Sequence, residues 1–231
     1  MSFALWMQKD WMRTQIMSNV NPKDLELYAV SDSQWLKPGE RLKDVIEQSI
    51  KGGVSFVQLR EKHATHQERL ALGREIKEIC LSYGVPFVIN DDVMCAKELG
   101  VGAHVGQDDM ELVEAREILG PSAIIGVSCQ TKEQALKAQS EGADYLGVGS
   151  FSFTATKPDA DIVGMDELRA ICESVTIPIV VIGGINKTTI SNFEGIDIDG
   201  IAVVSAIFKQ DDKTQAAKEL KCLVQKHILS N

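Results

Sequence analysis

The chain has 231 residues, of which 44% are hydrophobic and 25% are charged, and its formal net charge is -9. This composition is typical of a folded globular protein and excludes disordered, collagen-like and fibrous classes. The negative charge disfavours long-range attraction to nucleic acid or to an anionic membrane, so an anionic ligand would need a local cationic site.

The cysteines and the apolar segments indicate the cellular location of the protein. Cys80, Cys95, Cys129, Cys172 and Cys222 show neither CxxC pairs nor disulfide-framework spacing, which indicates reduced thiols. Charges interrupt the apolar start of the chain, and the longest uncharged apolar run, 176–186, is shorter than the roughly 20 residues that span a bilayer. We therefore predict a cytoplasmic protein with neither nucleic acid nor a membrane as partner; a homo-oligomer is left open.

Short β-branched runs alternate with helical patterns along most of the chain. The expected strands are LELYAV, VSFVQLR, PFVIN, AHVGQ, AIIGVS, DYLGVGS, PIVVIGGI and GIAVVSAIF; the helices after them are expected at 42–50, 68–83, 93–99, 111–119, 132–142, 165–175, 187–193 and 213–229. Such alternation predicts a parallel sheet, because each parallel crossover needs a helix to return the chain. Eight units predict an α/β fold, a single-domain (β/α)₈ TIM barrel over residues 25–231.

An open doubly wound sheet is the alternative fold. Its dinucleotide-binding form has a glycine fingerprint after the first strand, where this chain has SDSQW. Residues 1–24 belong to no barrel unit and carry a partial helical stripe of Trp and Met, so we predict a short N-terminal extension that is helical or loosely ordered.

Polar residues gather where the predicted strands end. They are Asp32, Arg60, Glu61, Lys62, Asn90, Asp91, Asp92, Gln107, Asp108, Ser128, Gly183, Gly184 and Ser205. In barrels of this kind the active site lies at the carboxyl ends of the strands, so we expect these residues to share one pocket.

The first group, Gln58, Arg60 and Lys62, leaves one strand at alternate positions, which directs the three side chains to the same side. Arg60 suits bidentate binding of phosphate, Lys62 suits a point-charge contact, and Gln58 offers an amide to a heterocycle. An ion-paired rim with Glu61 is the alternative interpretation.

Carboxylates form the second group, in Asn90-Asp91-Asp92 and in Gln107-Asp108-Asp109. Mg²⁺ takes one or two protein carboxylates and completes its octahedron with water and substrate phosphate. We predict Asp91 and Asp108 as its ligands, and helix N-capping for Asp92 and Asp109.

The third group is Gly183-Gly184 with Val204-Ser205, at the seventh and eighth strands, from which barrels commonly build a phosphate site. The loop after the sixth strand carries Thr154, Thr156 and Lys157 and is long enough to be a functional lid or a solvated surface loop. His104 alternates with strand residues and is expected in the barrel core.

Read together, GGVSFVQLREK, FVINDD, HVGQDD, IGVS, TATKPDA, IGGI and AVVSAI resemble the successive motifs of the thiamine-phosphate synthase family, from about residue 25 to 208. Each motif is weak alone, but seven in order at strand ends form a specific signal. The resemblance implies a Mg²⁺-dependent transferase of thiamine biosynthesis. It would join hydroxymethylpyrimidine diphosphate to a thiazole phosphate, or to its carboxylated form, and release pyrophosphate.

The resemblance also implies residue roles. Gln58 and Ser128 would bind the pyrimidine, and Arg60, Lys62, Asn90 and Lys157 its diphosphate. Asp91 and Asp108 would bind Mg²⁺, and Thr154, Thr156, Gly184, Val204 and Ser205 would hold the thiazole phosphate. Arg60, Lys62, Lys157 and Ser128 would act in catalysis, without a side-chain nucleophile.

One segment departs from the family pattern. The chain has Ser150-Phe-Ser-Phe153 where the family usually has an aromatic-proline stretch, which affects the expected placement of the thiazole. Three alternatives remain: a thiazole tautomerase, a phosphosugar or indole-pathway isomerase, and a non-catalytic barrel that senses thiamine intermediates.

Overall fold

The computed structural model describes residues 19–151 and 162–230. Eight parallel strands close into a barrel in chain order, and β8 pairs back onto β1. The strands are β1 (Leu27–Val30), β2 (Phe56–Leu59), β3 (Phe87–Asn90), β4 (Gly102–Val105), β5 (Ile125–Cys129), β6 (Tyr145–Val148), β7 (Ile179–Ile182) and β8 (Gly200–Val203). The predicted (β/α)₈ barrel is confirmed, and closure rules out the open sheet.

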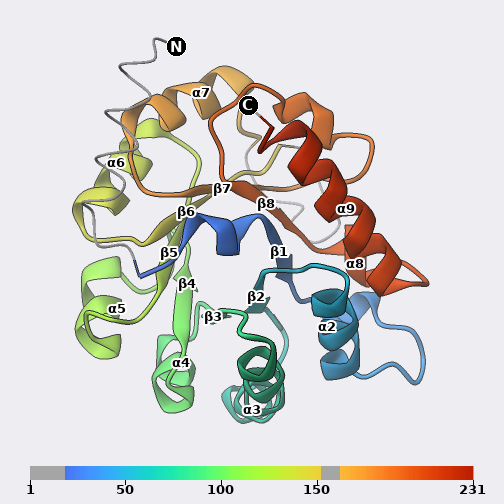
Figure 1. Ribbon diagram of the computed structural model, residues 1–231. Coiled ribbons are helices and arrows are strands. Elements are labelled where there is room, and N and C mark those ends of the chain that lie inside the picture. The colour runs from blue at the N-terminus through green and yellow to red at the C-terminus, as the bar shows by residue number, and fades with distance from the viewer. Residues whose placement is uncertain (1–18, 152–161, 231) are drawn as a thin grey trace.

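Helices surround the ring of strands (Figure 1). They are α2 (Leu42–Lys51), α3 (His66–Tyr83), α4 (Val93–Leu99), α5 (Leu112–Leu119), α6 (Lys132–Ser140), α7 (Met165–Ser174), α8 (Ser205–Phe208) and α9 (Lys213–His227), with 3₁₀ turns η1 (Pro22–Leu25), η2 (Ser33–Trp35) and η3 (Ile190–Phe193). Several begin at side-chain caps that the sequence offers, such as the capping box between Thr65 and Glu68 at α3.

Two elements differ from the sequence-based expectation. The helix expected at 187–193 is only the 3₁₀ turn η3, because the side chain of Asn186 accepts a hydrogen bond from the backbone N–H of Thr188 and the segment closes into a local turn. The eighth strand ends at Val203, and the SAIF segment that we assigned to it forms the short helix α8.

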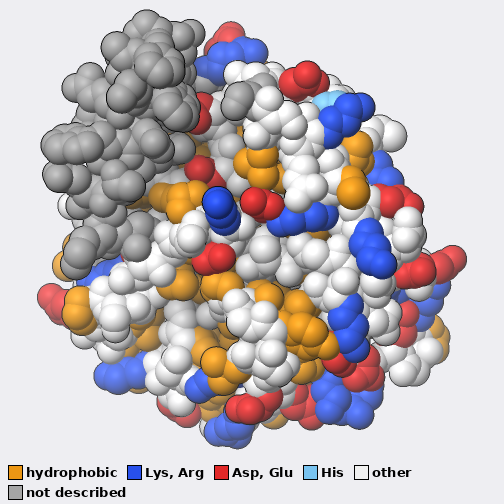
Figure 2. Space-filling model, in the orientation of Figure 1, with side chains coloured by type: hydrophobic (Ala, Val, Ile, Leu, Met, Phe, Trp, Pro, Cys, Tyr) orange, Lys and Arg blue, Asp and Glu red, His pale blue; other side chains and the backbone are white. Residues whose placement is uncertain are grey.

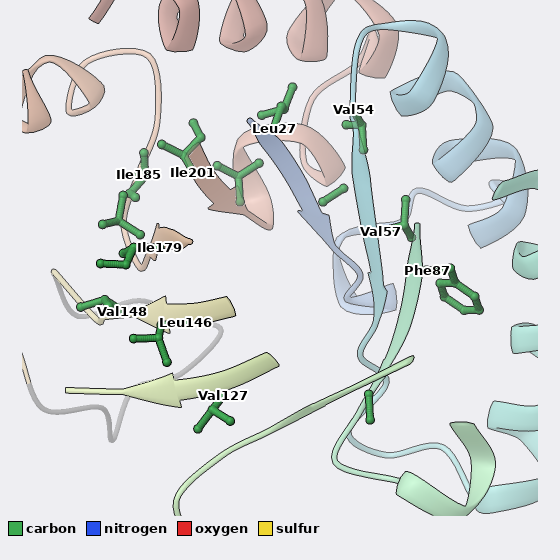
Figure 3. Close-up of a cluster of buried hydrophobic side chains, with 14 of the residues drawn as sticks. Leu27, Val54, Val57, Phe87, Val127, Leu146, Val148, Ile179, Ile185 and Ile201 are labelled. Atoms are coloured by element: carbon green, nitrogen blue, oxygen red, sulfur yellow. The ribbon is translucent and has the colours of Figure 1, made fainter. Parts of the chain in front are cut away.

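The two faces of each strand build two different cores. Residues such as Leu27, Val57 and Leu146 point outward and pack beneath the helices, and Figure 3 shows part of this outer cluster. The intervening residues point into the barrel, where Tyr28, Phe56 and Tyr145 meet with ring centroids 4.5–5.9 Å apart. This alternation is the period-2 geometry of a strand, and it places the aromatic rings inside the barrel.

The amino-terminal end of the barrel is covered by η1 and the residues just before it. Leu25 is fully buried and Val20 is 4% exposed, both packed against the interior cluster. The backbone N–H of Asn19 donates to Asp144 Oδ1 at 2.8 Å. Residues 1–18 lie outside the described part of the chain, so the domain boundary at residue 24 stays a prediction.

Basic and acidic side chains are interspersed on the face shown in Figure 2. In the described segments, no helix has both the length and the apolar character needed to cross a membrane. None of the five cysteines, all of which lie in the described residues, forms a disulfide bond, and four of them are buried.

Candidate active site

A cavity of about 520 Å³ opens at the carboxyl ends of the strands. Ten of the predicted site residues line it together: Gln58, Arg60, Lys62, Asn90, Asp91, Asp108, Ser128, Gly184, Val204 and Ser205. The other three, Thr154, Thr156 and Lys157, lie outside the described residues. Barrel closure thus gathers residues up to 147 positions apart, from Gln58 to Ser205, into one site.

The cationic side of the cavity is formed by Arg60 and Lys62, just after β2. Glu61, between them, turns toward β1: its carboxylate accepts hydrogen bonds from Ser31 Oγ at 2.7 Å and from the backbone N–H of Ser33 at 3.1 Å. Within residues 19–151 and 162–230, Glu61 forms no ion pair with either cation. The structure therefore disagrees with an Arg60–Glu61–Lys62 ion-paired rim and leaves both cations directed at the cavity.

Beside these cations, after the neighbouring strand β3, the carboxyl group of Asp91 lies within hydrogen-bonding reach of that of Asp109. Burial of the Asp91 carboxyl among protein atoms and then its proximity to Asp109 raise its pKa to about 7, although Arg60 acts in the lowering direction. Asp91 also has a φ of 61°, a left-handed conformation that few residues other than glycine adopt. Backbone strain of this kind is typical of functional sites.

The structure distinguishes Asp109 from its neighbour Asp108. Asp109 Oδ2 accepts a hydrogen bond from the backbone N–H of Gly106 at 2.7 Å, which fixes the carboxylate beside the end of β4. The N-cap of α5 is Glu111, so the expectation that Asp109 caps this helix is wrong. Asp92 does cap α4, accepting from the backbone N–H of Cys95 at 2.9 Å, which confirms its structural role.

The far side of the cavity has the features of an anion site. Gly183 and Gly184 follow β7 with φ values of 101° and 74°, which side-chain-bearing residues rarely adopt, and both line the cavity beside Val204 and Ser205. Lys209, which sequence reasoning missed, also lines this side and lies over the ring of Trp35, 5.4 Å from its centroid. Its spacing of four residues from Ser205 on the α8 segment was the available signal.

The cavity floor is polar and buried. Gln58 Nε2 donates to the Tyr28 hydroxyl at 2.6 Å, and the hydroxyls of Tyr28 and Tyr145 are 2.8 Å apart. His104 lies 2.9 Å from the Tyr145 hydroxyl through Nδ1 and 2.9 Å from Ser128 Oγ through Nε2. The expected interior position of His104 is confirmed, but the two tyrosines were missed as part of the site, although the parity of their strand positions indicates an inward direction.

A family profile described as "Thiamine monophosphate synthase" matches residues 27–207, nearly the whole barrel. The chain belongs to the thiamine-phosphate synthase family. The match covers every predicted site residue, including the three outside the described residues.

Two members of the thiamine-phosphate synthase family are similar to this chain over almost their full length. The thiamine-phosphate synthase of Clostridium beijerinckii is 46% identical over 204 residues, which covers 87% of this chain and 97% of the relative. That of Clostridium botulinum (strain Eklund 17B / Type B) is 44% identical over 202 residues, 87% of this chain and 94% of the relative.

Among solved structures, thiamine phosphate pyrophosphorylase from Pyrococcus furiosus superimposes with a TM-score of 0.82 at 35% identity, covering 90% of this chain and 98% of that protein. KGPDC from Streptococcus mutans matches with a TM-score of 0.61 at 14% identity, which shows a shared barrel fold.

The carboxylates of the site match what Mg²⁺ requires of a protein. In the described segments no group of three or more His, Cys, Asp or Glu side chains could hold a metal ion. Two hard carboxylate donors, Asp91 and Asp109, face each other in an open cavity, and such a pair fits a Mg²⁺ ion that keeps water and substrate phosphate as its other ligands.

Proposed function

We propose that this thiamine-phosphate synthase joins hydroxymethylpyrimidine diphosphate to a thiazole phosphate in a Mg²⁺-dependent reaction that releases pyrophosphate. The observation that carries the proposal is a single cavity with a cationic and acidic side at β2 to β4 and a glycine-rich side at β7 and β8. Two anionic substrates need two such sites, held close enough for their heterocycles to meet.

Arg60 and Lys62, joined by Asn90, would bind the diphosphate of the pyrimidine substrate. A guanidinium binds phosphate oxygens in pairs and an ammonium adds a point charge, so the two cations complement each other. The same role is proposed for Lys157. These cations would neutralise the negative charge that develops on the leaving group, which is the main requirement for a reaction in which the pyrimidine carbon becomes cation-like.

Asp91 would hold Mg²⁺. Its partner in this proposal is Asp109, because the carboxylate of Asp109 lies next to that of Asp91, whereas the metal role of Asp108 stays a prediction for a residue lining the same cavity. Mg²⁺ bound there would stabilise the charge on the departing pyrophosphate. Arg60, close enough to lower the pKa of Asp91, would contact the same phosphate oxygens.

The glycine-rich side would hold the thiazole phosphate. Backbone N–H groups near Gly184, Val204 and Ser205 would surround the phosphate, and we propose Thr154 and Thr156 as further contacts. Gln58 and Ser128, on the cavity floor, would orient the pyrimidine so that the thiazole nitrogen reaches its exocyclic carbon. A C–N bond forms as the C–O bond to the diphosphate breaks, so the residues contribute orientation and charge rather than a nucleophile.

The experiment is pyrophosphate release by the purified full chain with both substrates and Mg²⁺, followed by omission of each component in turn. Release that requires all three supports the proposal. Isomerisation of the thiazole alone would indicate a tautomerase, turnover of a phosphosugar without metal would indicate an isomerase, and tight binding without release would indicate a sensor.

We further propose a cytoplasmic location, supported by five cysteines that form no disulfide bond in the described residues. A homo-oligomer stays a prediction, which sedimentation velocity would test.

A further inference from the structure

Five side chains form one continuous hydrogen-bonded chain across the barrel floor: Gln58, Tyr28, Tyr145, His104 and Ser128. Its four links measure 2.6, 2.8, 2.9 and 2.9 Å. Four of its members, Gln58, Tyr28, His104 and Ser128, line the cavity, whereas Tyr145, the central link, does not line it and is fully buried. The hydrogen-bonded network therefore connects Gln58 and Ser128 along the cavity floor, through a central tyrosine that the cavity does not reach.

The barrel makes room for this hydrogen-bonded network by having glycine, which has no side chain, at one position on β5 and one on β6. A Cβ atom at Gly126 would overlap the ring and hydroxyl of Tyr145, and one at Gly147 would lie 3.1 Å from Cε1 of His104. Tyr28 and Tyr145 are also held by ring contacts with Phe56. Burial raises the pKa of both tyrosines, so each hydroxyl keeps its proton and can pass on one hydrogen bond.

The donor at one end fixes the direction of every other link. Gln58 donates its amide N–H to Tyr28, so the Tyr28 hydroxyl donates onward to Tyr145. Tyr145 then donates to Nδ1 of a neutral His104, whose proton lies on Nε2 and is donated to Ser128. The opposite direction would give Tyr28 two incoming protons and leave its own buried O–H unsatisfied, which is costly.

We propose that Tyr28, Tyr145 and His104 are positioning residues that make Gln58 an acceptor and Ser128 a donor toward the bound pyrimidine. With one of its two N–H groups donated to Tyr28, Gln58 is held in the orientation that presents its carbonyl oxygen to the pyrimidine; with its oxygen engaged by His104, Ser128 presents its O–H. The inference rests on the proposed function, in which these two residues bind the pyrimidine.

This acceptor and donor pair fits an aminopyrimidine. An exocyclic amino group donates to the Gln58 carbonyl, and a ring nitrogen accepts from the Ser128 hydroxyl. The two ends cannot change independently, because reversing one link reverses all of them. The hydrogen-bonded network thus couples the two contacts, and removing its central hydroxyl, that of Tyr145, should uncouple them.

The test is Tyr145→Phe, which removes one hydroxyl and keeps the ring. We expect the KM for the pyrimidine substrate to rise about tenfold, because that factor corresponds to the loss of one well-placed hydrogen bond. The KM for the thiazole phosphate should be unchanged. Tyr28→Phe should have the same effects on both KM values. Tyr83→Phe, which removes an exposed hydroxyl bonded to Glu47, is the matched control and should leave all parameters unchanged.

A double-mutant cycle then measures the coupling. In the otherwise unaltered chain, the effects of Gln58→Ala and Ser128→Ala on kcat/KM should depart from multiplicativity by at least about threefold, and in the Tyr145→Phe background they should multiply. Equal coupling in both backgrounds, or an unchanged pyrimidine KM, would overturn the proposal. Failure of the proposed function looks different, because Gln58→Ala and Ser128→Ala would then leave turnover of the pyrimidine unaffected.

A readout independent of activity is the ¹⁵N NMR spectrum of His104, assigned by comparison with His104→Asn. We expect a neutral ring with its proton on Nε2, and a changed Nδ1 shift in Tyr145→Phe. A proton on Nδ1 would mean that the hydrogen bonds run in the opposite direction and would contradict the inference.

Discussion

The carboxyl groups of Asp91 and Asp109 face each other across the ends of β3 and β4, within hydrogen-bonding reach. Two adjacent carboxylates cannot both ionise easily, and the pKa of Asp91 is raised to about 7. Near neutral pH the pair therefore takes up either a proton or a cation.

Mg²⁺ affinity should depend on pH. Because a proton on Asp91 must leave before the cation binds, apparent affinity should fall by up to tenfold per pH unit as pH drops well below 7 and level off above it. Titration calorimetry with the full chain at pH 6, 7 and 8, in buffers of different ionisation enthalpy, should show proton release at the lower pH values. Affinity independent of pH would contradict the assignment of Asp91 as a ligand.

Asp91→Asn should separate stability from activity. The amide removes the like-charge interaction with Asp109 while still tolerating the left-handed backbone, so the metal-free variant should be as stable as the original chain or up to about 1 kcal/mol more stable. The gain is small because the Asp91 side chain, although protein atoms surround much of its carboxyl group, is still reached by solvent in the cavity, which screens the interaction.

The Asp91→Asn variant should nevertheless release pyrophosphate at least about a hundredfold more slowly than the original chain.

Stability should depend on pH in a direction set by the raised pKa of Asp91. The metal-free original chain binds a proton at Asp91 in the folded state, so the contribution of Asp91 to stability declines as pH rises from about 4 to 7. Thermal unfolding in EDTA across that range should show this decline in the original chain and not in Asp91→Asn.

Asp108 and Asp109 form a matched pair of neighbours. Asp109→Asn should weaken Mg²⁺ binding and turnover at least about a hundredfold, whereas Asp108→Asn should change them by less than about tenfold. The reason is that the Asp109 carboxyl lies within hydrogen-bonding reach of that of Asp91. A larger loss in Asp108→Asn than in Asp109→Asn would favour the ligand predicted from sequence.

Arg60→Lys tests geometry rather than charge. A lysine keeps the positive charge but loses the planar pair of donors, so we expect kcat/KM for the pyrimidine substrate to fall about ten- to a hundredfold. Arg60→Ala should lower this kcat/KM further. If the lysine variant retains full activity, Arg60 acts only as a point charge.

Gly126→Ala should destabilise the barrel, because its Cβ would overlap the ring of Tyr145. The expected loss is about 1–3 kcal/mol in chemical denaturation, typical of overpacking in a filled core. Gly164→Ala is the control: no heavy atom of residues 19–151 or 162–230 lies within 4 Å of a Cβ there, and its φ of -75° suits alanine. Equal stability of both variants would contradict the close packing of Tyr145.

The sequence alone was sufficient for the architecture. Eight alternations of apolar runs with helical patterns predicted the barrel, because strand and helix periodicities are local and each parallel crossover constrains the next. Position at a strand end was likewise enough to collect Gln58, Arg60, Asn90 and Ser128 into one pocket, since all carboxyl ends of parallel strands meet at one face.

Only the tertiary structure decided which neighbouring side chains act together. Asp108 and Asp109 are equivalent in sequence, and it is the hydrogen bond from Gly106 that holds Asp109 beside Asp91. Tyr28 and Tyr145 are 117 residues apart, so no local pattern predicts that their hydroxyls meet. That contact exists because barrel closure brings strands from both halves of the chain around a common interior, where a buried hydroxyl requires a partner.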